Sequence, residues 1–414
     1  MTDARLEILI IGGGIVGMGV AQEATRRFPH LRLAVLEKES GVGLHQTGHN
    51  SGVIHSGVYY KPGSLKARTC VEGAAAMVAF CQQHGIPHEI CGKVIVATAE
   101  SETAQLKVLE DRGRTNGLQG LRMLTPQELR EFEPNVAGVA GLHVPSTGIT
   151  DYKMVTQKYA ELTRSRGGAV YLDSQVLGIR ASGEEFVVET KGGVYSGKYL
   201  INCAGLFSDR ISQMAGVEPE VRIIPFRGEY YDLTPERKHL VRGLIYPVPD
   251  PRFPFLGVHF TRRIHGNVDA GPNAVFAFKR EGYARTDFSM RDTLGSLSFP
   301  GFWKMAAKYW KSGVDEQFRS VSKGAFVKAL QRLVPDIRES DLTPGGSGVR
   351  AQAVTNEGAL VDDFKFAQSR NMLHVYNVPS PAATASLAIA RILVDTASST
   401  FGWREDGAGP GVPA

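Results

Sequence analysis

The chain begins with a short apolar run, a cluster of glycines and a second apolar segment. Residues 6–11 read Leu-Glu-Ile-Leu-Ile-Ile, and Gly12, Gly14 and Gly17 lead into an apolar stretch that extends to Ala24. This pattern predicts a buried strand, a tight turn and a helix. A further apolar run, residues 33–36, ends at the acidic residue Glu37. The order of strand, turn, helix, strand and acid is typical of a dinucleotide-binding unit.

Each of these residues has a physical task in such a unit. Gly12 permits the turn, Gly14 lets the backbone approach a pyrophosphate, and Gly17 brings the helix close to the strand. Glu37 can accept hydrogen bonds from a ribose, and the helix start attracts the phosphates. The sequence therefore predicts a nucleotide cofactor. The alternative is a glycine-rich turn inside an α/β core that binds nothing.

The remaining pattern predicts two domains that are interleaved along the chain. A small-residue loop at 41–52 precedes a helix from Ser64 to His84, and helical patterns return at 101–133 and after 278. We expect strands at 91–98, 170–203, 221–278 and 373–378. The fold class is α/β, with a Rossmann-like nucleotide domain and an inserted mixed β-sheet substrate domain. The expected segments are 1–90, 145–222 and 335–402 for the nucleotide domain, 91–144 and 223–334 for the substrate domain, and 403–414 for a disordered tail.

Two later segments favour flavin over nicotinamide. The apolar run at 199–203 ends in Ala204 and Gly205, so its end can lie against a flat ligand. Ser380 and Pro381 have the pattern of an N-cap and first residue of a helix that extends to about Ala397. The positive end of that helix would stabilise an anionic reduced flavin. An ordinary capped helix without a ligand is the alternative.

A longer run of residues resembles a known family. The stretch His45 to Pro62, with 226–230, 271–274 and 379–384, resembles the L-2-hydroxyglutarate dehydrogenase/oxidase family. That family belongs to the D-amino-acid-oxidase-like FAD oxidoreductases, and the likeness extends over nearly the whole chain. It implies a glutathione-reductase-type FAD domain and oxidation of L-2-hydroxyglutarate to 2-oxoglutarate. Electrons would pass to a membrane quinone or, less efficiently, to oxygen.

The resemblance also implies which residues bind FAD. One departure is that Pro381, Ala382 and Ala383 stand where the wider superfamily has glycines before its final helix. The implied FAD-binding residues are Gly12, Gly14, Ile15, Val16, Gly17, Glu37, Lys38, Gln46, Thr47, Asn50, Ser51, Gly52, Val53, Val176, Ala204, Gly205, Arg350, Ser380, Pro381, Ala382, Ala383 and Thr384.

Oxidation of a 2-hydroxy acid needs a base for the hydroxyl proton. Histidine suits this role because its pKa lies near working pH, and the candidates are His55 and His259. Either can instead be a structural histidine bonded to backbone. We expect no metal site, because no ligand spacing of that kind occurs.

A dicarboxylate substrate needs cations to match it. Arginine gives bidentate contacts, so Arg227 is the first choice and Lys279 the second, with a surface ion pair as the alternative for each. Tyr60 and Lys61 can complete the pocket. Arg350 resembles the superfamily arginine beside the flavin, which contacts cofactor or substrate carboxylate.

Charge is concentrated in one segment of the chain. Seven of the basic residues and two acids lie between Phe302 and Arg332, which matches the net charge of +5 for all 414 residues. Aromatic residues accompany the lysines, a mixture suited to the surface of an anionic membrane. The alternative is a helix whose aromatics face the core. The N-terminus lacks a signal-peptide pattern, which predicts a cytoplasmic protein. If residues 302–332 do face a membrane, we expect the protein to be attached peripherally to its inner face. No nucleic-acid-binding motif accompanies the charge.

Three alternatives to the dehydrogenase follow from these patterns. An amino-acid or amine oxidase of the same superfamily would share the FAD fold. A nucleotide-binding regulatory protein would bind cofactor without turnover, and a membrane-recruitment module would need only residues 302–332. The oligomeric state is not predicted.

Overall fold

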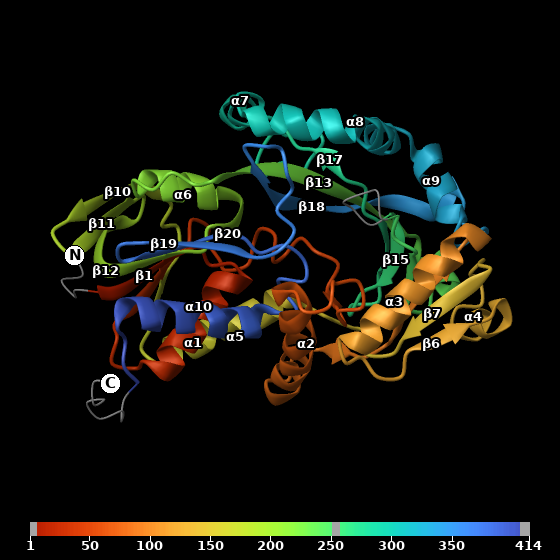
Figure 1. Ribbon diagram of the computed structural model, residues 1–414, viewed down its shortest axis with the longest axis horizontal. Coiled ribbons are helices and arrows are strands. Elements are labelled where there is room, and N and C mark those ends of the chain that lie inside the picture. The colour runs from red at the N-terminus through yellow and green to blue at the C-terminus, as the bar shows by residue number, and fades with distance from the viewer. Residues whose placement is uncertain (1–5, 251–256, 406–414) are drawn as a thin grey trace.

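The computed structural model describes residues 6–250 and 257–405, which form two large sheets joined by a small one (Figure 1). The eight-stranded sheet holds the N-terminal strand. The nine-stranded sheet lies on the opposite side of the molecule, with most of its helices on the outside.

The eight-stranded sheet has the predicted nucleotide-binding topology. Its parallel centre runs in the order β9 (Ala169–Tyr171), β2 (Leu33–Leu36), β1 (Leu6–Ile11), β12 (Gly193–Asn202) and β20 (Met372–Asn377). β10 (Val176–Ser182), β11 (Glu185–Thr190) and β19 (Lys365–Ser369) are added antiparallel. Because successive residues point to opposite faces, Ile8 and Ile10 pack in one core and Leu9 and Ile11 in another. The first core is shared with helices α1 (Ile15–Arg27), α5 (Tyr152–Ser165) and α10 (Ser386–Phe401).

The nine-stranded sheet is mixed and mostly antiparallel. Its order is β17 (Val275–Phe276), β13 (Val221–Leu233), β16 (Val268–Gly271), β15 (His259–Arg262), β14 (Leu244–Pro247), β5 (Lys93–Ala97), β7 (Ala140–Val144) and β6 (Arg122–Leu124), and β18 (Leu342–Thr355) pairs with β13. Around it lie α3 (Thr103–Thr115), α4 (Pro126–Phe132), α7 (Met290–Leu297), α8 (Pro300–Val321) and α9 (Lys323–Gln331), whereas α6 (Ser208–Met214) packs on the eight-stranded sheet.

The register of this sheet separates two faces that pack in different cores. Paired residues Ala270, Phe260, Ile245 and Val94 pack in one core with Phe326 of α9. Their chain neighbours therefore point to the other side, toward the small sheet of β3 (Val53–Ile54), β8 (Gly148–Thr150) and β4 (His88–Glu89) and toward α2 (Leu65–Gln83).

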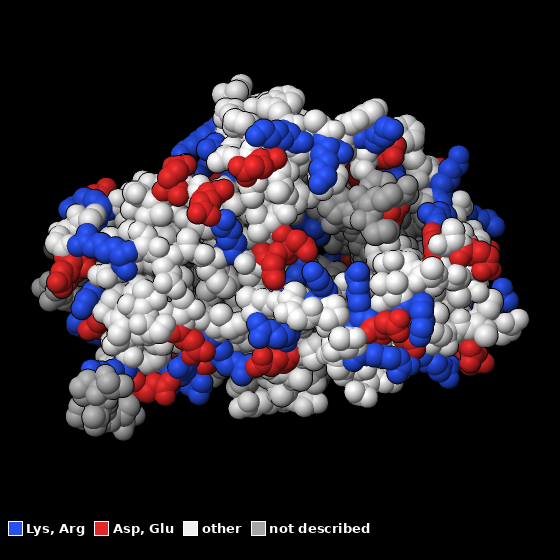
Figure 2. All heavy atoms as spheres, in the orientation of Figure 1, with Lys and Arg blue, Asp and Glu red and all other residues white. Residues whose placement is uncertain are grey.

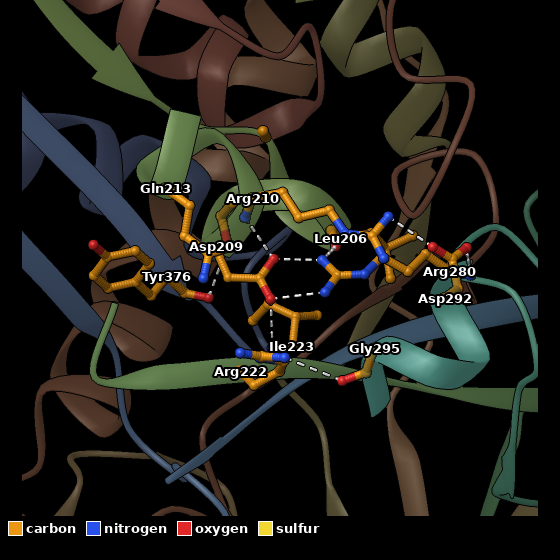
Figure 3. A network of polar contacts seen from close by, with 12 residues as sticks. Leu206, Asp209, Arg210, Gln213, Arg222, Ile223, Arg280, Asp292, Gly295 and Tyr376 are labelled. Atoms are coloured by element: carbon orange, nitrogen blue, oxygen red, sulfur yellow. Dashed lines mark hydrogen bonds and ion pairs between the residues drawn. The ribbon is translucent and has the colours of Figure 1, made fainter. Parts of the chain in front are cut away.

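A buried ionic network fixes α6 to the segment before α7 (Figure 3). Arg280 donates to both carboxylate oxygens of Asp209, and each residue is at most 3% exposed. Arg210 of α6 pairs with Asp292 of α7 at 2.6 Å. The Asp209 carboxylate also accepts the backbone N–H of Ile223 in β13. The network therefore joins the two halves of the molecule at one place.

Three expectations differ from the structure. Residues 342–355 form β18, which pairs with β13 along its length and so belongs to the nine-stranded sheet, although we expected 335–402 in the nucleotide domain. The final helix begins at Ser386 and not at Pro381. Trp403 of the expected disordered tail is 9% exposed and packs on Phe28, with ring centroids 5.4 Å apart. The rest of that tail, 406–414, lies outside the described residues.

Candidate active site

The glycine turn after β1 has the geometry that the sequence predicts. Gly12 has φ +109°, and a Cβ there would lie 2.5 Å from the Cys203 carbonyl oxygen. A Cβ on Gly17 would lie 2.0 Å from the Gly12 carbonyl oxygen, so only glycine lets α1 pack this close to β1. The tight turn at Gly12 and the close packing at Gly17 are observed, and their part in binding FAD remains a prediction. The end of β12, with Ala204, lies directly against the turn, and its expected contact with a flat ligand also remains a prediction.

The residues around the turn fit a dinucleotide. The start of α1 has no side-chain cap and no acid in its first turn, so its amides and its positive end suit a pyrophosphate. The nearest atom to a Cβ on Gly14 is Thr47 Oγ1 at 3.6 Å, which leaves space at this position. Glu37 follows β2, and its carboxylate accepts the Gly13 N–H at 2.6 Å and the Glu39 N–H at 2.9 Å. The carboxylate is therefore held beside the turn, where a ribose would lie.

The loop from Gln46 to Val53 closes over this turn. Thr47 Oγ1 accepts the Ile15 N–H at 3.0 Å, and the Asn50 side chain donates to the carbonyls of Gln46 and Thr47. Gln46 Oε1 would lie 3.0 Å from a Cβ on Gly205. These contacts bring together segments that are distant in sequence. Other implied contacts near the loop, Val16, Ser51, Gly52 and Val176, remain predictions.

Lys38 is held by neighbouring side chains. Its Nζ pairs with Glu39, lies 2.7 Å from Glu281 and lies 2.8 Å from His45 Nε2. Glu39, His45 and Glu281 converge in the manner of metal ligands. The lysine ammonium already lies among them and takes the position of the cation.

The segment 380–384 is not the start of a helix, so the prediction for Ser380 and Pro381 is wrong. It forms turns, with the Ala385 N–H donating to the Pro381 carbonyl at 2.9 Å. Thr384 Oγ1 instead accepts the His55 N–H at 3.1 Å and lies 2.9 Å from the Tyr152 hydroxyl. The side chain is therefore used to fix the backbone at His55 and not to cap a helix.

Both candidate histidines lie in one cluster with a lysine. His259 stacks on Tyr246 with ring centroids 4.0 Å apart. Lys93 Nζ lies 5.0 Å from the centroid of the same tyrosine ring and 4.4 Å from that of Tyr59. The charges of Lys93 and His259 both act on the pKa of His55. The cluster therefore joins the loop after β3 to strands β5, β14 and β15.

Both imidazoles are neutral near pH 7. Burial, together with the neighbouring charges of Lys93, His259 and Lys66, lowers the pKa of His55 to about 3. Burial lowers the pKa of His259 to about 4. His259 Nδ1 lies 2.9 Å from the Gly257 carbonyl oxygen, and a donor there leaves Nε2 with its lone pair. Either ring can thus accept a proton.

Arg350 lies on β18, on the same face as Phe226 of β13. Its residue is solvent-accessible, yet desolvation lowers the pKa of its guanidinium. The charges of Tyr60 and Tyr230 act on its pKa, and the Tyr60 hydroxyl contacts the Ser380 side chain. Burial raises the pKa of Tyr230 to about 12 and that of Tyr60 well above its ordinary value. Both phenols remain protonated hydrogen-bond donors.

Arg227 is not part of this cluster. It pairs with Val349 across β13 and β18, whereas Arg350 pairs with Phe226, so the two arginines point to opposite faces. The Arg227 guanidinium donates to Glu229 at 2.9 and 3.1 Å and to a backbone carbonyl. We gave a surface ion pair as the alternative, and the observed arrangement is an ion pair that is buried.

Two other predicted cations also lie outside the cluster. Lys61 is exposed and Lys279 is half-buried, and no contact joins either to the histidines within the described residues. Lys93 and Tyr246 were missed. The signal for Lys93 was a lysine directly before the apolar run Val-Ile-Val-Ala of a predicted strand.

The basic aromatic segment forms α8, and its tryptophans do not face the core. Phe302 is 9% exposed, whereas Trp303 and Trp310 are 58% and 59% exposed. Val314, Phe318 and Val321 continue the exposed row, and Met290 and Leu294 of α7 are exposed beside it. Figure 2 shows Lys and Arg side chains among uncharged surface along the edge that α7 and α8 form. No helix among the described residues is both long and apolar enough to cross a bilayer.

Comparisons with known proteins found a family model and similar proteins that cover most of the chain. A family model described as FAD dependent oxidoreductase matches residues 7–396. L-2-hydroxyglutarate dehydrogenase of Indibacter alkaliphilus is 53% identical, covering 95% of this chain and 99% of that protein. The human mitochondrial L-2-hydroxyglutarate dehydrogenase is 45% identical, covering 97% of this chain and 90% of that protein.

Solved structures confirm the predicted fold class. L-α-glycerophosphate oxidase of Mycoplasma pneumoniae, with FAD bound, has a TM-score of 0.78 at 22% identity and covers 97% of this chain and 96% of that one. Glycine oxidase of Geobacillus kaustophilus has a TM-score of 0.71 at 19% identity, covering 98% and 97%. At these identities the likeness concerns the fold alone.

Proposed function

The chain belongs to the FAD-dependent oxidoreductases and, within them, to the L-2-hydroxyglutarate dehydrogenase family, and from this we propose that it oxidises L-2-hydroxyglutarate to 2-oxoglutarate. The observation that supports the proposal most directly is the histidine cluster. Two imidazoles that are neutral near pH 7 lie there, and oxidation of a 2-hydroxy acid requires such a proton acceptor.

Each group of residues has a separate role in the proposed reaction. The turn from Gly12 to Gly17 and the carboxylate of Glu37 hold the dinucleotide. Arg350 binds a substrate carboxylate, and His55 or His259 accepts the hydroxyl proton. FAD, when bound, supplies the acceptor for the hydride of the substrate carbon. Tyr60 and Tyr230, protonated and buried, are available as hydrogen-bond donors to the substrate.

Anaerobic titration tests this proposal. The holoenzyme is mixed without oxygen with L-2-hydroxyglutarate, with its D enantiomer and with a set of amino acids, and flavin absorbance is followed. We expect bleaching by L-2-hydroxyglutarate alone. Bleaching by amino acids instead would identify an amino-acid oxidase, and bound FAD that none of them reduces would favour a binding protein without turnover.

We further propose that α7 and α8 attach the enzyme to the inner face of an anionic membrane, where a quinone takes the electrons. Exposed Trp303 and Trp310 can enter the headgroup layer, and Lys308 and Lys311 beside them can attract anionic lipid. Titration with a quinone analogue, with and without oxygen, tests which acceptor reoxidises the flavin.

Vesicle sedimentation tests the attachment. We expect binding to vesicles that contain phosphatidylglycerol, weak binding to phosphatidylcholine vesicles, and loss of binding when Trp303 and Trp310 are both replaced by Ser. A matched control replaces Leu177 and Val194, which are 55% and 65% exposed on β10 and β12, by Ser. Equal loss in the control, or no binding by the unaltered protein, contradicts the attachment.

A further inference from the structure

Lys93 is a cation in the protein interior without an anionic partner. Its residue is 2% exposed at the start of β5. No hydrogen bond or ion pair joins it to any other residue in the described parts of the chain, and its neighbours are the rings of Tyr59 and Tyr246. Cys70 acts on its charge, but burial raises the pKa of that thiol to about 12, so the thiol stays neutral. Burying an ammonium in this way is costly, and a buried charge is usually paired.

The position of Lys93 shows what could pair with it. Strand alternation puts Val94 in the outer core with Ile245, so Lys93 points to the opposite face, where Tyr246 and His259 stack. Its charge acts on the pKa of both His55 and His259. The ammonium is therefore directed at the groups that handle the reacting hydroxyl.

The proposed substrate carries two carboxylates, and Lys93 can pair with one of them. A substrate in which a methyl group replaces that carboxylate would leave the buried ammonium without a partner, which costs binding free energy.

We propose that Lys93 binds one of the two carboxylates of the substrate and so selects dicarboxylic over monocarboxylic 2-hydroxy acids. This rests on the proposed function, and it assigns to Lys93 the role that the sequence had suggested for Arg227 or Lys279. Removal of a charged partner from a buried pair weakens binding, so a loss of about 100-fold in kcat/KM is expected for the dicarboxylate.

The test compares two substrates in three proteins. The substrates are L-2-hydroxyglutarate and L-2-hydroxyvalerate, in which a methyl group replaces the distant carboxylate. The proteins are the unaltered enzyme, Lys93→Met, and Lys191→Met as a control at an exposed lysine between β11 and β12. We expect Lys93→Met to lose about 100-fold with the dicarboxylate and less than about threefold with the monocarboxylate, and Lys191→Met to change neither.

Two measurements without turnover complete the test. Glutarate, which has both carboxylates and no hydroxyl, should perturb the flavin spectrum with a Kd about 100-fold higher in Lys93→Met, while the Kd of butyrate stays unchanged. Because the substitution removes an unpaired buried charge, Lys93→Met should unfold at the same or a higher temperature. Equal losses with both substrates, or a lower unfolding temperature, would overturn the assignment by indicating a general or structural role.

These outcomes are separable from those of the proposed function. If L-2-hydroxyglutarate does not bleach the unaltered enzyme, the proposed function fails. If it bleaches that enzyme and Lys93→Met keeps the full preference for the dicarboxylate, only the role of Lys93 is refuted.

Discussion

The protonation of Lys93 should control substrate capture at alkaline pH. Burial lowers the pKa of this lysine from its ordinary 10.5 to about 7. The ammonium form is therefore present below pH 7 and lost above it. Because kcat/KM reports the free enzyme, its value for a dicarboxylate should fall tenfold for each pH unit above about 7, or about 100-fold at pH 9.

Four neighbouring groups should leave this limb of the profile clear, whereas burial raises the pKa of Asp269, which acts on Tyr246 and Tyr230, to about 7. Loss of the limb in Lys93→Met distinguishes the lysine from Asp269. His55 and His259 have pKa values of about 3 and 4, and Cys70 and Tyr230 have pKa values of about 12. None of these four titrates near pH 7. The histidines must lose their proton before they can accept one, so they place an acid limb near pH 3–4 and a plateau above it.

The assay is the pH dependence of kcat/KM for L-2-hydroxyglutarate and L-2-hydroxyvalerate between pH 5 and 9, taken as about two units either side of 7. We expect the alkaline limb with the dicarboxylate alone, and its disappearance in Lys93→Met. The free energy of unfolding gives a second readout. Between pH 7 and 10.5 the lysine binds a proton in the unfolded chain but not in the native protein. Lys93 therefore makes the free energy of unfolding rise with pH across that range. An alkaline limb that is the same for both substrates, or that persists in Lys93→Met, refutes the reasoning.

Three further predictions concern the proton, the fold and the cofactor. Replacing the proton-accepting histidine, His55 or His259, by Ala should slow anaerobic flavin reduction by about 100-fold, and a loss below tenfold in both variants would place the base elsewhere. Arg280→Met leaves Asp209 buried without its bidentate partner and should lower the free energy of unfolding in urea by about 3–5 kcal/mol, whereas no change would show that the pair contributes nothing. Gly17→Ala places a Cβ 2.0 Å from a backbone oxygen and should reduce retained FAD, measured as the ratio of visible to ultraviolet absorbance; full retention would contradict the close packing.

Local patterns were sufficient for the nucleotide-binding half of the fold. The strand, turn and helix from Leu6 onward depend on neighbouring residues, and so does the helix predicted from Ser64, which caps α2 by accepting the Ala67 N–H. The start of the last helix failed for a related reason. Ser380 and Pro381 have the local chemistry of a helix start, but Thr384 bonds to the backbone of residues 53 and 55, and that distant contact is invisible in the local pattern.

The positions of the charged residues at the site depend on strand pairing, which the local sequence does not reveal. Arg227 and Arg350 both lie in strands rich in apolar residues, and only the pairing of Phe226 with Arg350 reveals that they face opposite sides. A slip of one residue in that pairing would exchange them, because side chains alternate along a strand. Lys93 depends on the same register through β5 and β14. Burial of Lys93 without an anionic partner destabilises the folded protein, and no local sequence preference explains it. Such a residue is most readily retained where a ligand pairs with it. The unpaired ammonium is therefore a stronger guide to the substrate than the well-paired guanidinium of Arg227.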